Sequence, residues 1–491
     1  MKAVLEVGKM TRNGNNGLKR DAMGTAEIVF LIIAFAAPLA ASTSNIPIAI
    51  GFGNGIGAPG AWVLIGVVLA LFSVAYTAMS RYLTDSGAFY AYITAGFGRH
   101  LGVGAGYVAL VSYASSVILI SGFFGFFASE MLSSELGVAI AWPWMSLLGL
   151  VVVSILGYLG VRSSVRILAV LLVVETLLLV AIVVAVFLAV GPAGYSLSSF
   201  APSHVLSGSP GLALAFAIST YFGFEAGAIY SEEARNAKRT ITRATLIAIG
   251  VIGVLYVATS WSTVAALGAD QASAAAARDP GNLFFDIADR YLGSWAVHMF
   301  HILVVTSLLA VLIAGYNSLA RYTYSLARDG WLFKALAITH PKRHSPYVAN
   351  AAVLVIAAGV VGAFAVAGAD PVTHLGATFI VMQALGLIGL MVLVSVAAIR
   401  FFRRGGYEVG SFTAVFAPAV SAIALAATGV VTVQNFSLIT GSSSPVIGML
   451  PLVLLIALAA GPLMVARRGR DAGSRSANGS VSVDISEGKL S

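Results

Sequence analysis

Long apolar runs alternate along the chain with short polar segments, and the runs have the length of membrane helices. A spanning helix needs about 20 apolar residues. Two intervals, Glu27 to Arg81 and Glu408 to Arg467, enclose no charged residue, and each is long enough for two spans. Together with eight further windows they predict twelve spans, at roughly 26–50, 60–80, 101–129, 142–160, 165–190, 211–231, 244–266, 297–325, 347–367, 373–398, 412–433 and 447–466.

Two of these spans carry signs of an interruption in mid-membrane. In span 1, Pro38 removes a helical hydrogen bond, and the hydroxyls at 42–44 are expected to cap a restarting helix. In span 6, Gly223 lies two residues before Glu225. A carboxylate at membrane depth is costly and marks function, and irregular backbone is tolerated there only where it lines a cavity. We therefore predict that spans 1 and 6 are broken helices.

The spacing of the two breaks predicts the architecture. They lie five spans apart, so the two segments enter the membrane from opposite sides, and paired interruptions of this kind point to a transporter binding site. The sequence predicts an all-α integral membrane protein in which spans 1–5 and 6–10 form an inverted 5+5 repeat, with two C-terminal helices added. The transmembrane domain covers 25–466, between a cytoplasmic N-terminal tail at 1–24 and a disordered cytoplasmic tail at 467–491.

Composition and charge agree with a membrane protein and set its orientation. The chain of 491 residues is 59% hydrophobic and 10% charged, with a mean hydropathy of +0.93, which excludes a soluble globular protein. The net charge of +8 is not a nucleic-acid signal, because 26 of the 28 Lys and Arg fall in predicted cytoplasmic segments and only Arg278 and Arg290 fall outside. This asymmetry predicts that both termini are cytoplasmic in a plasma (inner) membrane, where the basic residues can contact anionic lipids.

Three stretches resemble motifs of a known family. They are Phe222-Gly-Phe-Glu225 with Glu232-Glu233-Ala-Arg-Asn236 and Arg239, then Asn317 to Arg321 through Ala327-Arg-Asp-Gly330, and Ser86-Gly87-Ala-Phe-Tyr90. With these motifs the chain resembles the amino acid–polyamine–organocation transporters, whose fold was first seen in the bacterial leucine transporter. Ala237 and Thr242 depart from the family's usual prolines, and Trp331-Leu-Phe333 from its leucine–proline ending.

The resemblance implies a secondary transporter that moves amino acids by alternating access. Transport is coupled to protons or is an exchange; sodium coupling stays open. Polyamines are less favoured as substrates, because Ser112 stands where polyamine importers of the family often have an acid. We find no repeated filter or charged ring of a channel, no convergent catalytic groups and no cofactor motif.

The substrate site is expected at the two breaks. The first would offer backbone amides to an α-carboxylate, and the second would offer carbonyls to an ammonium, with Phe222 and Phe224 as walls or gates. A simple proline kink is the alternative for the first break. The candidate residues are Ala37, Pro38, Ala40, Ala41, Ser42, Thr43, Tyr113, Phe222, Gly223, Phe224, Glu225, Ser307 and Gln383.

Two carboxyls are candidates for carrying a proton. Glu175 lies near the centre of span 5 with no Lys or Arg at its depth, and burial without a cationic partner disfavours the charged form. The resemblance adds that some family members place a titratable lysine on this span. A neutral carboxyl hydrogen-bonded between helices is the alternative for Glu175. For Glu225, capping of the second half-helix is the alternative.

Two further features carry a simpler interpretation. His298 and His301 have no Cys or carboxylate at metal-ligand spacing, so we interpret them as interfacial anchors and predict no metal site. The glycine-rich run Gly51–Gly57 lacks the preceding strand and following acid of a nucleotide-binding loop, so we expect a flexible turn.

Overall fold

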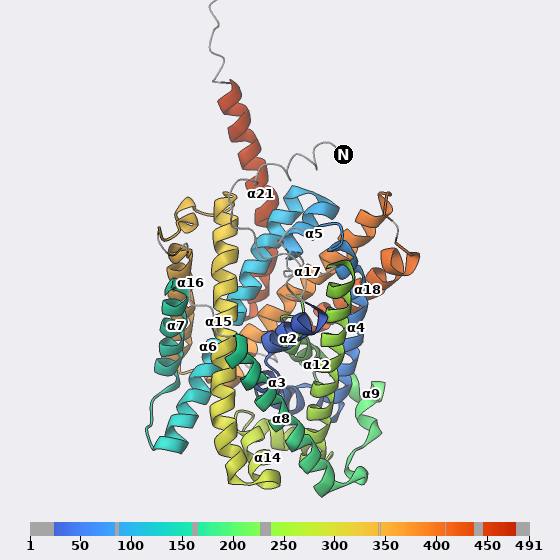
Figure 1. Ribbon diagram of the computed structural model, residues 1–491, viewed down its shortest axis with the longest axis vertical. Helices are drawn as coiled ribbons and strands as arrows, with labels where there is room; N and C mark the ends of the chain where they lie inside the picture. Colours follow the sequence, from blue (N-terminus) through green and yellow to red (C-terminus); the bar gives the residue numbers. More distant parts are fainter. Residues whose placement is uncertain are drawn as a thin grey trace, which may run out of the picture.

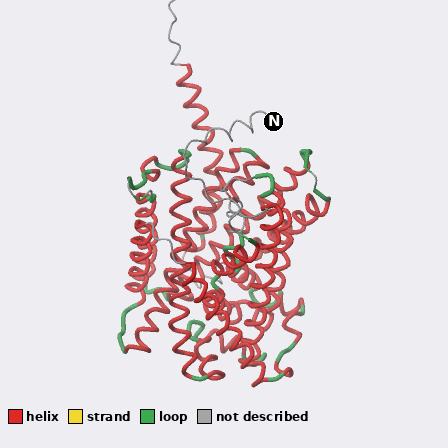
Figure 2. The backbone as a smooth tube through the Cα atoms, viewed as in Figure 1, coloured by secondary structure: helices red, strands yellow, loops and turns green. Residues whose placement is uncertain are grey.

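The computed structural model is built from helices and connecting segments, and the residues that it describes contain no strand (Figure 2). These residues are 24–83, 88–159, 165–225, 237–341, 343, 345–407, 409–436 and 445–477. Among them, 10 helices are long and apolar enough to cross a membrane, and two shorter apolar helices are Thr25–Ala36 and Pro210–Thr220. The predicted all-helical membrane architecture is therefore confirmed, and the count of twelve spans stays a prediction.

The helices of the first half lie close to the predicted windows. They are α2 (Thr25–Ala36), α3 (Pro38–Ile48), η1 (Ala49–Asn54), η2 (Gly55–Gly57), α4 (Ala58–Met79), α5 (Ala88–Phe97), α6 (Arg99–Leu136), α7 (Trp142–Leu159) and α8 (Val165–Val190). A helix satisfies all its backbone groups within one segment, which hydrocarbon surroundings require. Apolar length therefore locates these helices well.

The second half continues in the same way. Its main helices are α10 (Pro210–Thr220), α12 (Ala237–Leu267), α13 (Ala272–Arg278), α14 (Leu283–Leu292), α15 (Ser294–Arg328), α16 (Tyr347–Val366), η7 (Pro371–Gly376), α17 (Ala377–Arg403), α18 (Ala417–Gln434) and α21 (Leu450–Ala477). The shorter elements are η3 (Pro192–Gly194), η4 (Leu197–Phe200), α9 (Pro202–Val205), η6 (Lys334–Ala337), η8 (Phe412–Phe416) and α20 (Pro445–Gly448). The short helices α13 and α14 lie between the predicted spans 244–266 and 297–325.

Burial separates a central group of helices from a peripheral one. The apolar windows of α6 and α17 are each 78% buried, whereas that of α21 is 6% buried. Figure 1 shows α15 running the full height of the bundle, with α2 and α3 near its middle, α14 at its lower end and α21 projecting from its upper end. Ten of the 11 residues of α3 are buried, so this helix lies inside the bundle, whereas three of the 12 residues of α2 are buried.

The glycine-rich run between α3 and α4 consists mostly of short helical turns, with non-helical backbone at Gly53 and Gly55, so it is more regular than the turn that we expected. Residues Ala49–Asn54 form a π-helical segment and Gly55–Gly57 a 3-10 turn. A β-carbon on Gly51 would lie 2.8 Å from the backbone nitrogen of Ala277 on α13. The glycine therefore permits close packing of two backbones, which a motif comparison does not reveal.

Some predicted features lie beyond the predicted boundaries or outside the described residues. Helix α21 continues to Ala477, past residue 466, because helical hydrogen bonding does not end where the apolar window does. The tail segments 1–23 and 478–491, the motif residues 232–236 and the Ser86-Gly87 pair lie outside the described residues.

Candidate functional site

The first interruption lies at Ala37, one residue before the proline. Helix α2 ends at Ala36, Ala37 has φ 43° and ψ 71°, and Pro38 is the first residue of α3. This left-handed conformation is strained for a residue with a β-carbon. Proline suits the start of α3, where its missing N–H would have no helical acceptor. Pro38 therefore begins the second helix here.

The hydroxyls after this break do not cap α3, so that expectation is wrong. The Thr43 hydroxyl donates to the Leu39 carbonyl at 2.9 Å, and the Ser44 hydroxyl donates to the Ala40 carbonyl at 2.5 Å. Both bonds run back one turn inside α3, because these residues lie more than a turn beyond the helix start.

The N-terminus of α3 presents backbone donors at the interruption. Pro38 has no N–H, and the first bond into α3 runs from the Ala41 N–H to the Ala37 carbonyl at 2.9 Å. The N–H groups of Leu39 and Ala40 therefore have no acceptor within the helix. Together with the helix dipole, they favour a negative group at this point.

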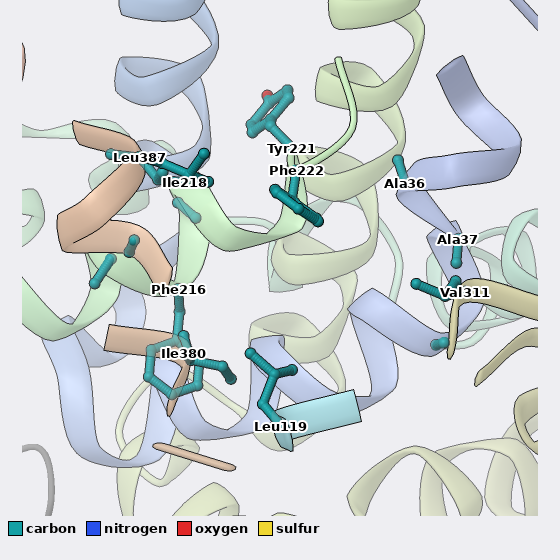
Figure 3. Packing of buried hydrophobic residues seen from close by; sticks show 14 of the residues in the cluster. Ala36, Ala37, Leu119, Phe216, Ile218, Tyr221, Phe222, Val311, Ile380 and Leu387 are labelled. Carbon is teal, nitrogen blue, oxygen red and sulfur yellow. The ribbon is translucent and has the colours of Figure 1, made fainter. Parts of the chain in front are cut away.

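The second interruption follows α10 and faces the first. Helix α10 ends at Thr220 and a turn runs through Tyr221–Glu225, in which Gly223 has φ 102°. A β-carbon on Gly223 would lie 2.1 Å from Cδ1 of Phe35. Figure 3 shows the turn that carries Tyr221 and Phe222 on one side and the Ala36–Ala37 segment on the other.

A tyrosine from α12 contacts both interrupted helices. The Tyr256 hydroxyl lies 3.2 Å from the Ala36 carbonyl and 3.0 Å from the Thr220 carbonyl, and the side chain is fully buried. These are the last carbonyls of α2 and α10, the type of group that a helix end leaves without an intrahelical donor. Sequence analysis missed Tyr256, because no local pattern marks a partner 220 residues away.

Glu225 is hydrogen-bonded within the second interruption. Its Oε2 accepts from the Gly223 N–H at 3.0 Å, and its Oε1 accepts from the Tyr113 hydroxyl at 3.3 Å. The Tyr113 ring packs in turn on Phe222, with ring centroids 5.2 Å apart. Glu225 is 1% exposed, so these contacts hold the turn against α6. The half-helix that Glu225 would cap begins outside the described residues, so the capping interpretation stays a prediction.

A cavity of about 60 Å³ lies between the two interruptions. It has room for only a few waters, so a larger ligand requires side chains such as Phe35 and Phe222 to move. The residues that line it are Phe35, Ala36, Ala37, Ala40, Ala41, Ser44, Asn45, Leu119, Ile120, Phe123, Ser219, Phe222, Leu308, Val311 and Gln383.

Five predicted site residues are part of this lining: Ala37, Ala40, Ala41, Phe222 and Gln383. Gln383 accepts a hydrogen bond at 2.7 Å from Ser219 on α10, which fixes the amide beside the cavity. The other predicted residues lie around the cavity and not on its wall: Pro38, Ser42, Thr43, Tyr113, Gly223, Phe224, Glu225 and Ser307.

Asn45 is a lining residue that sequence analysis missed. It is 5% exposed, and its Oδ1 has no hydrogen-bond partner within the described part of the chain. A buried polar atom without a partner is costly, so Asn45 is suited to a polar ligand. The sequence feature that could have identified it is an amide side chain in an apolar span, two turns after the interruption.

Glu175 lies behind the cavity wall, not on it. This residue of α8 is 4% exposed and interacts with Ser307 on α15. It is also close enough to Tyr256 for an electrostatic interaction. A change of charge at Glu175 would therefore act on the tyrosine that contacts both interruptions.

The two histidines at the start of α15 have a carboxylate partner that their spacing did not reveal. Oε1 of Glu135, at the end of α6, lies 2.7 Å from Nδ1 of His298 and 2.8 Å from Nδ1 of His301. Glu135 precedes His298 by 163 residues, so the sequence spacing around the histidines could not identify it. The described residues contain no group of three ligands arranged to hold a metal ion.

Sequence comparison assigns the chain to a family. A family profile described as "Amino acid permease" matches residues 25–460. The chain belongs to the amino acid permease family. Its members are membrane transporters, in agreement with the family resemblance of the sequence motifs.

The permease is similar to several curated proteins. It is 25% identical over 380 residues to an uncharacterized transporter of Mycobacterium tuberculosis, covering 72% of this chain and 82% of that protein. It is 24% identical over 357 residues to a branched-chain amino acid permease of Bacillus subtilis, covering 69% and 73%. A methylthioribose transporter of the same organism is 23% identical over 377 residues, covering 74% and 77%.

A solved structure shares the fold of the permease. A manganese transporter of Eremococcus coleocola superposes with a TM-score of 0.59 at 14% identity, covering 93% of this chain and 97% of that one. The similarity at this level of identity concerns the fold alone.

Proposed function

We propose that the permease imports neutral amino acids with aliphatic side chains across the plasma membrane. The observation that carries this proposal is the cavity between the two interruptions. None of the 15 described residues that line it is charged. A buried charge without a partner is strongly disfavoured, so this wall favours substrates whose side chain is neutral.

The main chain of the substrate is assigned to the two interruptions. Its carboxylate would accept from the amide N–H groups of Leu39 and Ala40, where the dipole of α3 favours negative charge. Its ammonium would approach the carbonyls of the turn at Tyr221–Glu225. The paired interruptions support this assignment, since substrate sites of such transporters lie at discontinuous helices.

The side chain of the substrate is assigned to the apolar part of the cavity. Leu119, Ile120 and Phe123 come from α6, while Leu308 and Val311 come from α15. Such a wall favours leucine, isoleucine or valine. The named relative that transports branched-chain amino acids supports the same class.

Transport is proposed to proceed by alternating access of an inverted repeat. The cavity of about 60 Å³ is smaller than a bound amino acid needs. Phe222 packs on Phe35 across the interruptions, with ring centroids 5.6 Å apart. Separation of these two rings would open the site, so we assign them as the inner gate of the cavity.

We assign proton coupling to Glu175, with Glu225 as the alternative. Glu175 is buried and has no hydrogen-bonding partner at the gate itself, but its interaction with Tyr256 joins it to both interruptions. Glu225 already accepts one hydrogen bond from the turn and one from Tyr113 of α6, so its carboxylate has a structural role there. Substrate exchange without protons is the competing mechanism.

Reconstitution into liposomes tests the proposal. Purified permease should show saturable uptake of labelled leucine under an inward proton gradient, and unlabelled isoleucine and valine should compete. Lysine, glutamate and putrescine should not compete. Equal competition by lysine or glutamate would overturn the substrate class. If uptake requires amino acid inside the liposomes at every pH gradient tested, the mechanism is exchange and not symport.

A further inference from the structure

A second cavity lies at the end of the bundle opposite to the projecting end of α21. It encloses about 280 Å³ between the end of α12 and the two short helices α13 and α14. Figure 1 shows α14 at the lower end of the bundle, remote from the upper end where α21 projects. The lining residues are Ala266, Leu267, Ala275, Arg278, Asp279, Leu283, Asp286, Ile287, Arg290 and Tyr291.

Both cationic side chains at this cavity are available to a ligand. Arg278 and Arg290 are exposed, and neither forms an ion pair or side-chain hydrogen bond with any residue in the described ranges. They are also the two basic residues that the charge pattern places outside the cell. The guanidinium group has a planar set of donors that matches a carboxylate.

The acidic side chains at the cavity differ from each other. Asp279 accepts from the backbone and side-chain N–H groups of Asn282 at 3.2 and 2.9 Å, so it holds the loop before α14. The Asp286 side chain has no hydrogen-bond partner among the described residues. Partial burial, and then the neighbouring Asp279 and Asp289 carboxylates, raise the pKa of Asp286. A cationic group placed beside Asp286 would relieve this unfavourable environment.

Charge balance selects the class of ligand. The charges of the two arginines and two aspartates sum to zero, so the cavity presents both positive and negative groups. Its apolar floor is formed by Leu283, Ile287 and Leu267. An inorganic anion would face two carboxylates, and a diamine would face two guanidinium groups. A zwitterion with an apolar side chain complements both signs and the floor. Ligand pockets commonly enclose about 300 to 1,000 Å³, so this cavity suits a small ligand.

We propose that this cavity is a second, external binding site for a zwitterionic amino acid. The ligand carboxylate binds Arg278 and Arg290, and its ammonium binds Asp286. This site lies outside the transport cavity and goes beyond the proposed transport function.

The packing of α13 connects the external site to the transport path. The backbone of α13 at Ala277 lies against Gly51 of η1, which continues the helix that begins at the first interruption. Residue Phe285 of α14 stacks on His301 of α15, with ring centroids 4.6 Å apart. A ligand held between α13 and α14 would therefore restrain the outer end of α3 relative to α15.

Calorimetry on the full-length protein in detergent tests the site with leucine as the probe. The central site is blocked by Ala40→Leu, which places a larger side chain on the cavity wall, and the remaining binding is then measured. We expect one leucine per chain in this variant and two in the unblocked protein. Adding Arg278→Gln and Arg290→Gln should weaken the remaining binding at least tenfold, whereas adding Asp270→Asn, in the same segment but off the cavity, should leave it unchanged.

Two analogues distinguish a zwitterion site from other sites. Leucine methyl ester lacks the carboxylate and 4-methylpentanoate lacks the ammonium, so neither should bind the blocked variant with comparable affinity. Equal binding of 4-methylpentanoate would make this an anion site and overturn the proposal. Absence of leucine binding to the blocked variant, or binding unaffected by the arginine changes, would also overturn it. Failure of the transport proposal gives a different result, since Ala40→Leu would then remove no binding.

Discussion

The ring of Phe35 packs directly against the α-carbon of Gly223, so a β-carbon at that position would lie 2.1 Å from the ring. The two residues come from the two interrupted segments of the bundle. Gly223 also has φ 102°, a conformation that residues with a β-carbon rarely adopt. Glycine is therefore required here by both its backbone conformation and its contact with Phe35.

The first prediction follows from this contact. Gly223→Ala should abolish or strongly reduce leucine uptake and should lower stability by about 1–3 kcal/mol through backbone strain alone. Uptake in liposomes and thermal unfolding in detergent measure the two effects. Gly250→Ala on α12, where an added β-carbon meets nothing within 4 Å, is the control and should behave like the wild type. Wild-type uptake by Gly223→Ala would refute the close packing of the two interruptions.

The second prediction concerns the tyrosine shared by both interruptions. Tyr256→Phe removes the donor to the Ala36 and Thr220 carbonyls, and a buried group left without a partner costs about 1–3 kcal/mol. Tyr316→Phe is the matched control, because that buried hydroxyl donates at 2.6 Å to the Asn350 carbonyl, away from the interruptions. Both variants should unfold at lower temperature. Only Tyr256→Phe should lose uptake per folded molecule, and an equal loss in both would leave Tyr256 without a special role.

The third prediction concerns the size of the substrate side chain. Val311→Ala enlarges the apolar part of the cavity, so the preference for phenylalanine over valine should rise, by about tenfold for a change of this size. Competition against labelled leucine uptake gives the ratio. Val304→Ala removes the same atoms from a buried residue of α15 that does not line the cavity, and its ratio should stay at the wild-type value. An unchanged ratio in Val311→Ala would remove α15 from the substrate pocket.

The fourth prediction separates the two buried carboxyls. Glu175→Gln keeps the shape and removes the titration, so the variant should exchange leucine across the membrane but lose accumulation driven by a pH gradient. Counterflow and gradient-driven uptake in the same liposomes measure the two activities. In Glu225→Gln an amide can still accept from the Gly223 N–H, so accumulation should persist. The reverse pattern would assign proton coupling to Glu225.

The fifth prediction concerns orientation in the membrane. The chain has no cysteine, so single cysteines can be introduced without background. Ser273→Cys, in an exposed position on α13, should react with an impermeant thiol reagent in intact cells. Ala335→Cys, exposed beyond the other end of α15, should react only after the cells are opened. Labelling of position 335 from outside would invert the predicted topology.

The sequence predicted the helices better than it predicted the contacts. The helix windows follow from apolar length because the membrane is a uniform solvent that acts on each segment separately. Pro38, the local signal for an interruption within Ala37 to Thr43, is the first residue of α3. The hydroxyls of Thr43 and Ser44 were misassigned because a serine or threonine in a helix can equally bond back to the preceding turn.

The missed features depend on residues far apart in the chain. Tyr256 meets Ala36 across 220 positions, and Glu135 meets His298 across 163. Neither partner has a local pattern that distinguishes it from an ordinary tyrosine or a solvated acid. The cavity walls from α6 and α15 were missed for the same reason, since Leu119 and Val311 look like any other apolar residue of a span.

The uncharged wall of the transport cavity has an electrical consequence. An amino acid zwitterion carries no net charge, and in the proposed alternating-access cycle the 15 lining residues add none. The membrane voltage then does work only on ions that accompany the substrate, about 2.3 kcal/mol per elementary charge for each 100 mV. Leucine-evoked current divided by leucine flux therefore counts the coupling ions directly, and electrically silent transport excludes proton symport.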